Sequence, residues 1–320
     1  MDPSEYRKQY EKEIAGAAEQ IDRPALKGVL PKVDGLDQGP GLSEGYSISD
    51  LMQIATDSSR DVAVRTAAIE AIGEGTIESE ETIQSLLVLL RDRSEPVELR
   101  RAVFTLLKQL GFQSKLFAAK RAEFISVLRE LCDDSDAEIR TRALETLAQK
   151  KDNFAQQRLL EGLRDQGKAL VPEERALQFL GYDIHADYYP LIREIAQKTG
   201  NPLAKHEAIR LLSSDPEAAS LLVGIFRDKG ENAEVRNACA AALRAVAPLE
   251  FERVARETAL DDDDSDEVRA ASITGLTYFG NRAAVARDNE LSDHLESIPG
   301  KGKSKSLERA VERYKARRSY

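Results

Sequence analysis

A twelve-residue pattern recurs along this chain about every 34 residues. In each copy an apolar residue precedes an Arg or Lys, and small or apolar residues follow three, six and seven places later. Six copies are evident: DVAVRTAAIEAI from Asp61, PVELRRAVFTLL from Pro96, DAEIRTRALETL from Asp136, NPLAKHEAIRLL from Asn201, NAEVRNACAAAL from Asn232 and SDEVRAASITGL from Ser265. Such a period predicts a stacked array, because each unit can bury its apolar face only against its neighbours.

The basic residue of each copy marks its position along the chain, at Arg65, Arg100, Arg140, Lys205, Arg236 and Arg269. Most gaps between these positions are 31 to 40 residues, but the gap between Arg140 and Lys205 is 65 residues. That gap is two periods long and predicts a degenerate seventh unit, VPEERALQFLGY at 171–182. With Glu173 in the basic position, the three apolar positions of this unit fall on Ala176, Phe179 and Leu180.

Each unit is expected to contain two helices. The recurring pattern has helical spacing, and Asp, Asn or Ser precedes several copies, where a side-chain oxygen can cap the helix. A second helical stripe comes before the pattern, for example Ile83, Leu86, Leu87 and Leu90. No segment alternates with a period of two, so we expect no sheet.

A helix pair per 31–40 residues, with D-x-x-V-R-x-x-A-x-x-A-L in the second helix, resembles HEAT repeats, in particular the bacterial type also found in phycobilin lyases. The resemblance covers about residues 48–280. It implies an all-α fold, a right-handed α-α superhelix (solenoid) of about seven helix pairs, in which the recurring arginines bond to neighbouring units. We divide the chain into an N-terminal helix and extended arm at 1–47, the repeat array at 48–280, and C-terminal helices with a basic tail at 281–320.

Composition excludes several classes of protein. The formal net charge of −10 argues against a chain built mainly to bind nucleic acid, which needs a basic surface. The charged N-terminus lacks the apolar region of a signal peptide, and no apolar run is long enough to span a membrane, so a cytoplasmic location is expected. Cys132 and Cys239 occupy apolar helical positions and are expected to be buried thiols.

Motifs that suggest chemistry are incomplete. HEAT-like deoxyhypusine hydroxylases bind iron through repeated His-Glu pairs, whereas His206-Glu207 is the only such pair here. The acidic run 261–267 lacks the Gly and Glu of a calcium loop, and Gly302-Lys303-Ser304 lacks the leading Gly of a P-loop. We therefore expect no enzymatic activity, no catalytic residue, no cofactor and no metal site. A solvated loop whose negative charge favours the N-terminus of the following helix explains the acidic run, with contact to a basic partner as the alternative.

Partner-binding residues are predicted in two places. The resemblance implies that the second helices line the concave surface, where the basic and polar candidates are Arg101, Lys108, His206, Arg210, Asn237 and Arg244. The C-terminal segment 300–320 has eight basic and two acidic residues, and its basic residues are Lys301, Lys303, Lys305, Arg309, Arg313, Lys315, Arg317 and Arg318. Three interpretations of this segment stay open: a mobile solvated tail, a segment docking on an acidic surface including its own array, or one that binds nucleic acid or a membrane surface.

The leading functional hypothesis is a non-catalytic scaffold or adaptor that binds a protein or peptide on its concave face, because stacking creates a long shallow groove without a deep dry pocket. The alternatives are a bilin lyase-like or chaperone-like factor that holds a chromophore or client subunit, and nucleic-acid binding through the basic tail. Membrane insertion is not expected, since the tail helix has only a narrow apolar face of Leu307, Val311 and Tyr314.

Overall fold

The structure is a computed structural model that describes residues 46–73, 77, 79–113, 115–185, 187–298 and 304–318. The predicted N-terminal helix and nearly all of the arm lie outside the described residues. Within the described ranges the chain forms seventeen α-helices and two short 3-10 helices, with no strand. The predicted all-α fold is confirmed.

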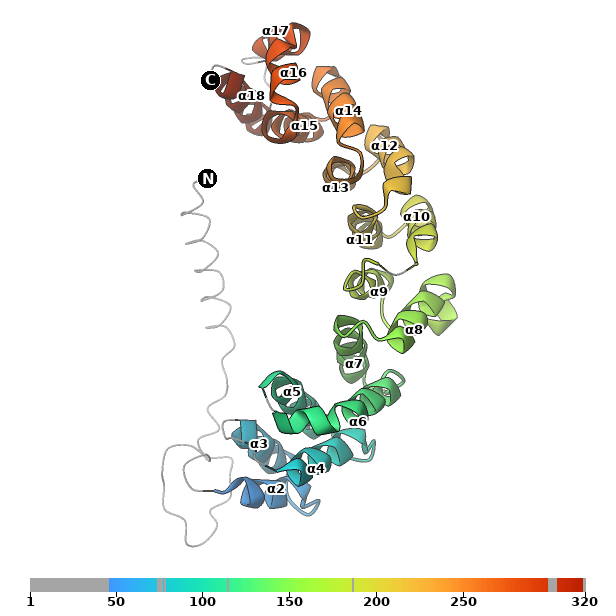
Figure 1. Cartoon of the computed structure of the whole chain (residues 1–320), viewed down its shortest axis with the longest axis vertical. Coiled ribbons are helices and arrows are strands. Elements are labelled where there is room, and N and C mark those ends of the chain that lie inside the picture. Colours follow the sequence, from blue (N-terminus) through green and yellow to red (C-terminus); the bar gives the residue numbers. More distant parts are fainter. Residues whose placement is uncertain are drawn as a thin grey trace. The chain divides into compact units, whose positions relative to one another are not determined.

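The helices follow one another along the chain in seven pairs, and Figure 1 labels them. The first helices of the pairs are α2 (Ile48–Thr56), α4 (Glu80–Arg91), α6 (Lys115–Leu131), α8 (Asn153–Arg164), α10 (Tyr189–Lys198), α12 (Ala219–Arg227) and α14 (Pro248–Leu260). The second helices are α3 (Val62–Gly73), α5 (Val97–Gln113), α7 (Ala137–Gln149), α9 (Glu173–Leu180), α11 (Pro202–Leu212), α13 (Ala233–Val246) and α15 (Asp266–Phe279). The chain ends in α16 (Arg282–Arg287), α17 (Asn289–Glu296) and α18 (Lys305–Arg318), and η2 (Gln166–Lys168) and η3 (Pro216–Ala218) lie in the turns.

The sequence pattern explains where the second helices begin. Asp136, Asn201 and Ser265 each stand just before one of them and accept a hydrogen bond from an amide of its first turn. The degenerate seventh unit forms α9, and the Phe179 and Leu180 side chains in its predicted apolar positions are each 2% exposed. The sequence prediction of about seven helix pairs is therefore confirmed.

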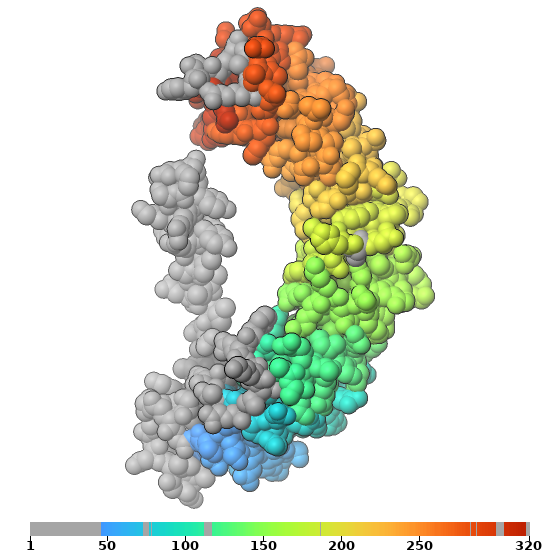
Figure 2. All heavy atoms as spheres, in the orientation of Figure 1, coloured from blue at the N-terminus to red at the C-terminus, as the bar shows by residue number. Residues whose placement is uncertain are grey.

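The described residues fall into two compact units, with the division between Val127 and Leu128. In the C-terminal unit, the second helices α7, α9, α11, α13 and α15 pack one after another in a row, and α8, α10, α12 and α14 form the other row (Figure 1). The space-filling view shows this unit hollowed on the side of the second helices (Figure 2). We call that side the inner surface. The domain boundaries predicted at residues 47 and 280 remain predictions.

Candidate functional site

The recurring arginines are structural residues of the repeats. Arg65, Arg100 and Arg236 are each at most 3% exposed, and the Nε of each donates to the carbonyl oxygen ten residues earlier, over 2.7 to 3.0 Å. Each bond joins the second helix of a pair to the end of the first helix. Arg269, at 0% exposure, reaches the Ala259 carbonyl in the same way through Nη2. These guanidinium groups are buried and bond within the repeats, so they are not available to a ligand.

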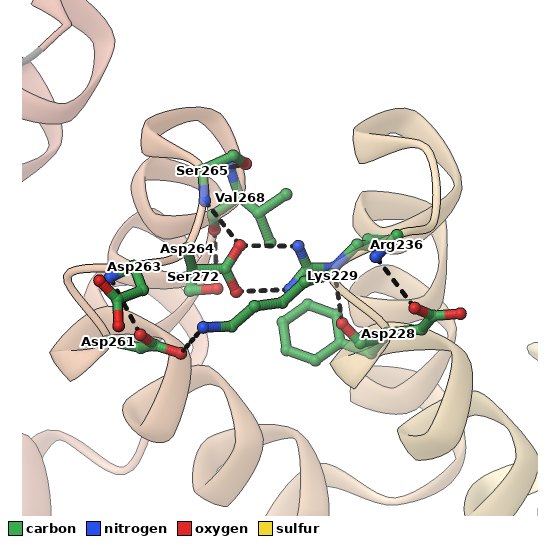
Figure 3. Close-up of polar contacts among 11 residues, drawn as sticks. Asp228, Lys229, Arg236, Asp261, Asp263, Asp264, Ser265, Val268 and Ser272 are labelled. Atoms are coloured by element: carbon green, nitrogen blue, oxygen red, sulfur yellow. Dashed lines mark hydrogen bonds and ion pairs between the residues drawn. The ribbon is translucent and has the colours of Figure 1, made fainter.

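The acidic run 261–267 pairs with cations of the same compact unit (Figure 3). The Asp264 carboxylate accepts two hydrogen bonds from Arg236, over 2.7 and 2.5 Å. Asp261 pairs with Lys229 at 2.6 Å, and Asp262 pairs with Arg269 at 2.8 Å. These contacts support a role for the run within the fold and not in contact with a basic partner, because three of its carboxylates already have cationic partners in the same chain.

Hydrogen bonding keeps the Asp264 carboxylate ionised. Burial raises its pKa, but the hydrogen bonds from Arg236 and the Ser265 amide outweigh burial, so the pKa lies below its ordinary value. The hydrogen bond from Lys229 is the largest influence on Asp261 and likewise lowers its pKa. Both aspartates therefore act as permanent anions at neutral pH.

The basic C-terminal segment docks on its own array. The Leu307, Val311 and Tyr314 side chains of α18 are each at most 1% exposed, and α18 packs on α15. The Ser304 amide donates to Asp266 at the start of α15, over 2.6 Å, and the Tyr314 hydroxyl donates to the Val285 carbonyl, over 3.1 Å. The interpretation as a mobile tail is wrong for residues 304–318, because the narrow apolar face predicted for this helix packs against the array and is buried.

Docking of α18 completes a pocket of about 460 Å³ on the inner surface of the C-terminal unit, which we call the arginine pocket. Helix α13 contributes Arg244 to its lining, and α18 contributes Arg309 and Arg313. All three arginine side chains are exposed. No Asp or Glu lines the pocket, and none of the three arginines pairs with a carboxylate of the described residues.

The floor of the arginine pocket is apolar. It is formed by Phe251 of α14, Phe279 of α15 and small residues of α13 and α15, namely Ala240, Ala241, Ala270, Ala271 and Gly275. The Phe251 ring fits because Gly275 has no side chain; a Cβ there would lie 2.6 Å from Phe251 Cζ. The Arg244 guanidinium carbon lies 3.7 Å from the centroid of the Phe279 ring, which is a stacked cation–π contact.

Three polar side chains, Asn237, Thr274 and Ser306, complete the pocket wall. The Oδ1 atom of Asn237 is buried and has no hydrogen-bond partner among the described residues. The oxygen and nitrogen of a side-chain amide exchange places by a flip, so Asn237 can offer a ligand either an acceptor or two donors. The pocket thus combines three cationic groups, an Asn237 oxygen without a hydrogen-bond partner and an apolar lining.

The structure brings together some of the predicted residues and separates others. Asn237, Arg244, Arg309 and Arg313 all line the arginine pocket. His206 and Arg210 are exposed on α11, where Arg210 pairs with Glu207 at 2.7 Å, and neither lines the pocket. Arg101 and Lys108 lie on α5, in the other compact unit.

Of the remaining basic residues of the C-terminal segment, Lys305, Lys315 and Arg317 lie on α18 but do not line the pocket. The Arg317 guanidinium lies 5.3 Å from the Tyr278 ring centroid. Lys301 and Lys303 lie outside the described residues, as does the side chain of Arg318. The sequence also gave no sign of Phe251, Phe279 or Ser306, since a single apolar or hydroxyl residue between repeats has no distinctive spacing.

No three His, Cys, Asp or Glu side chains in the described ranges gather so that they could hold a metal ion. Among the helices that the structure describes, none is long and apolar enough to cross a membrane.

No protein-family model matches this chain, and no curated protein matches it. Among solved structures, the chain is similar to the complex of CpcE and CpcF of phycocyanin lyase from Nostoc sp. PCC7120, with 20% identity, a TM-score of 0.38, and coverage of 89% of this chain and 99% of that one. It is also similar to human deoxyhypusine hydroxylase in complex with glycerol, with 19% identity, a TM-score of 0.32, and coverage of 72% of this chain and 94% of that one.

The helix pairs described above have the fold that the resemblance to HEAT-repeat proteins implied, and that resemblance is confirmed at the level of the fold. The expectation that the chain has no enzymatic activity is corrected: the two similar structures are of proteins named as a lyase and a hydroxylase. That expectation assumed that stacked helix pairs leave only a shallow groove. The arginine pocket shows that this array contains a ligand-sized concavity on its inner surface.

Proposed function

We propose that the inner surface of the C-terminal unit binds an acidic segment of a partner protein, which is anchored in the arginine pocket. The observation that carries this proposal is the set of three exposed arginines, Arg244, Arg309 and Arg313, gathered around an apolar floor without a carboxylate. Arginine forks match the geometry of carboxylates, and a pocket that combines them with aromatic groups suits a peptide anchor.

Arginines elsewhere on this unit behave differently. Arg129 pairs with Asp152 at 2.7 Å, and Arg227 pairs with Glu257 at 2.5 Å. The Arg256 guanidinium is held by two carboxylates, Asp288 and Glu290, both at 2.5 Å. The chain carries a net charge of −10, yet Arg244, Arg309 and Arg313 have no carboxylate partner among the described residues, so this cluster is available for an external anion.

Photo-crosslinking in the native organism tests the proposal directly. A photoreactive residue replaces Ala241, which is exposed and lines the arginine pocket; in the control it replaces Leu249, which is 80% exposed and lies outside the lining. We expect a protein adduct specific to position 241, with an acidic crosslinked peptide. The yield should fall in the R309Q/R313Q double variant and persist in R253Q, which changes an exposed arginine of α14 outside the pocket.

The other anions that arginines can hold give distinct outcomes. A visible-wavelength absorbance change on adding a bilin, lost in R309Q/R313Q, would replace the protein partner with a chromophore. A salt-dependent mobility shift with single-stranded nucleic acid, lost in the same variant, would replace it with nucleic acid. Equal adducts at positions 241 and 249 would refute any specific anchor in the pocket.

A further inference from the structure

The arginine pocket carries more positive charge than one carboxylate requires. Arg244, Arg309 and Arg313 together present three guanidinium groups, and no lining residue is acidic. A single carboxylate has two oxygens and one negative charge, which one bidentate arginine can satisfy. A phosphate monoester at neutral pH has a charge of about −1.5 to −2 and three acceptor oxygens, so it matches a group of arginines better.

The pocket is also larger than an anion alone needs. Its volume of about 460 Å³ lies within the range of pockets for organic ligands, which is roughly 300–1,000 Å³. A water molecule in the liquid occupies only about 30 Å³, so a bare phosphate would leave most of the space to solvent. The volume therefore leaves room for an organic group beside the charged one.

The floor indicates the shape of that organic group. Gly275 and its small neighbours on α15 and α13 line the pocket with few side-chain atoms, together with the rings of Phe251 and Phe279. Aromatic rings pack well on such surfaces, through edge-to-face or offset-stacked contacts. Arg244 already stacks on Phe279 at 3.7 Å, which leaves the guanidinium edge free to bond an anion beside the ring.

We propose that the arginine pocket takes a phosphate monoester on an aromatic ring, so that the partner is anchored by a phosphorylated tyrosine. This rests on the proposed function and names the side chain that the partner inserts. Arg309 and Arg313 bind the phosphate oxygens, Arg244 lies between the phosphate and the ring, and the Asn237 amide or the Ser306 hydroxyl completes the hydrogen bonds. Recognition of phosphorylated motifs by arginine clusters is an established physical mode of peptide binding.

The test is a set of fluorescent peptides that are identical except at one central residue, which is phosphotyrosine, tyrosine, glutamate or phosphoserine. Anisotropy titrations with the full-length chain should show phosphotyrosine binding at least about tenfold more tightly than glutamate, and tyrosine binding weakest. Phenyl phosphate should displace the phosphotyrosine peptide at lower concentration than either benzoate or inorganic phosphate does. The first comparison tests the charge, and the second tests the combination of charge and ring.

Variants assign the effect to the pocket. Each of R309Q and R313Q should weaken phosphotyrosine binding about tenfold or more, by removing charge-assisted hydrogen bonds. R309K keeps the charge but loses the fork, and should lie between R309Q and the unmodified chain. R253Q is the matched control and should bind normally, and circular dichroism confirms that each variant is folded.

Three results would overturn the inference. Equal affinity for the glutamate and phosphotyrosine peptides would show a general acidic anchor, and the proposed function would stand without the phosphate. Binding of phenyl phosphate with no binding of any peptide would indicate a small-molecule site and would remove the protein partner. Phosphotyrosine binding that survives R309Q/R313Q would place the site elsewhere.

Discussion

Removing the carboxylate of Asp264 tests whether the buried arginines hold neighbouring repeats together. Asp264 lies in the turn between α14 and α15 and bonds to Arg236 of α13, the second helix of the preceding pair. Both side chains are 3% exposed. The third bond of the guanidinium, from Nε to the Phe226 carbonyl, stays within the pair of Arg236. The substitution Asp264→Ala therefore removes the contact between repeats and leaves the contact within the repeat.

Two independent routes give the expected size of the effect. Two hydrogen bonds with a charged group at about 1.5–3 kcal/mol each sum to about 3–6 kcal/mol. Breaking a buried ion pair by removing one partner costs about 3–5 kcal/mol, because the remaining charge is left without compensation. We therefore expect Asp264→Ala to lower the free energy of unfolding of this region by about 3–5 kcal/mol. The exposed neighbour Asp263 provides the control, since Asp263→Ala should cost less than about 0.5 kcal/mol.

A double variant separates the charge from the packing. Arg236→Met retains an unbranched side chain against Phe226 and removes the cation. Combined with Asp264→Ala, it should restore most of the lost stability, because no buried charge then lacks a partner. If the double variant is as unstable as Asp264→Ala alone, the penalty does not come from the stranded guanidinium and the reasoning is wrong.

Hydrogen exchange measured by mass spectrometry localises the loss. A loss of about 3 kcal/mol makes amides of α13 and α15 exchange about a hundredfold faster, while α8 should change little. Acid should have a similar effect. Because the pKa of Asp264 is lowered in the folded protein, its contribution is complete above the unfolded pKa of about 3.9 and is lost as the pH falls through the folded value. Asp264→Ala should abolish this part of the acid response.

Two further predictions concern individual side chains of the array. Gly275→Ala should lower the free energy of unfolding by about 1–3 kcal/mol, because its Cβ would meet Phe251. Gly224→Ala in α12 should raise it by about 0.5–1 kcal/mol, because no atom lies within 4 Å of a Cβ built there. Urea unfolding measures both variants, and a Gly275→Ala chain more stable than the Gly224→Ala chain would contradict the packing. Burial raises the pKa of both Cys132 and Cys239 to about 12, so a disulfide reagent at pH 8 should label neither thiol until denaturant is added, and rapid labelling of the folded chain would refute their burial.

The array could be predicted from the sequence because its information is local and repeated. The residues that pack between helices recur at fixed distances from each basic residue, so even the altered unit at 171–182 could be found by counting. Its Glu173 begins α9, and Ala176 is 4% exposed. The buried arginines were recognisable as structural for the same reason. A residue that recurs from unit to unit belongs to the architecture of the repeat, whereas a functional site occurs once.

The arginine pocket could be predicted only in fragments. Arg244 and Arg309 were each candidates, but nothing in the sequence placed them on one site, since they meet only when α18 docks on α15. That docking depends on the fit between two apolar surfaces distant in sequence, and the three apolar residues of α18 are also compatible with a solvated helix. The role of Phe251 likewise depends on a missing Cβ at Gly275, which is a property of the packed structure.

The bond from each buried arginine to a carbonyl ten residues earlier has a consequence for where this chain can change length. The interval of ten is the same at Arg65, Arg100 and Arg236, whereas the distance from one basic residue to the next varies from 31 to 40 residues where no unit intervenes. Arg140 departs from the interval, and its guanidinium instead reaches the Asp134 and Leu170 carbonyls.

In the pairs that contain Arg65, Arg100 and Arg236, five residues separate the two helices, whereas eight residues separate α8 from α9 and three separate α10 from α11, where no arginine makes this bond. The interval of ten therefore constrains the turn within a pair only where the buried arginine is present. One residue inserted into that turn would move the guanidinium past its carbonyl and leave a buried donor unpaired, whereas the turn after the second helix carries no such constraint. A tag or a recognition loop grafted onto this array belongs in the turns between pairs, where the repeats have already accepted different lengths.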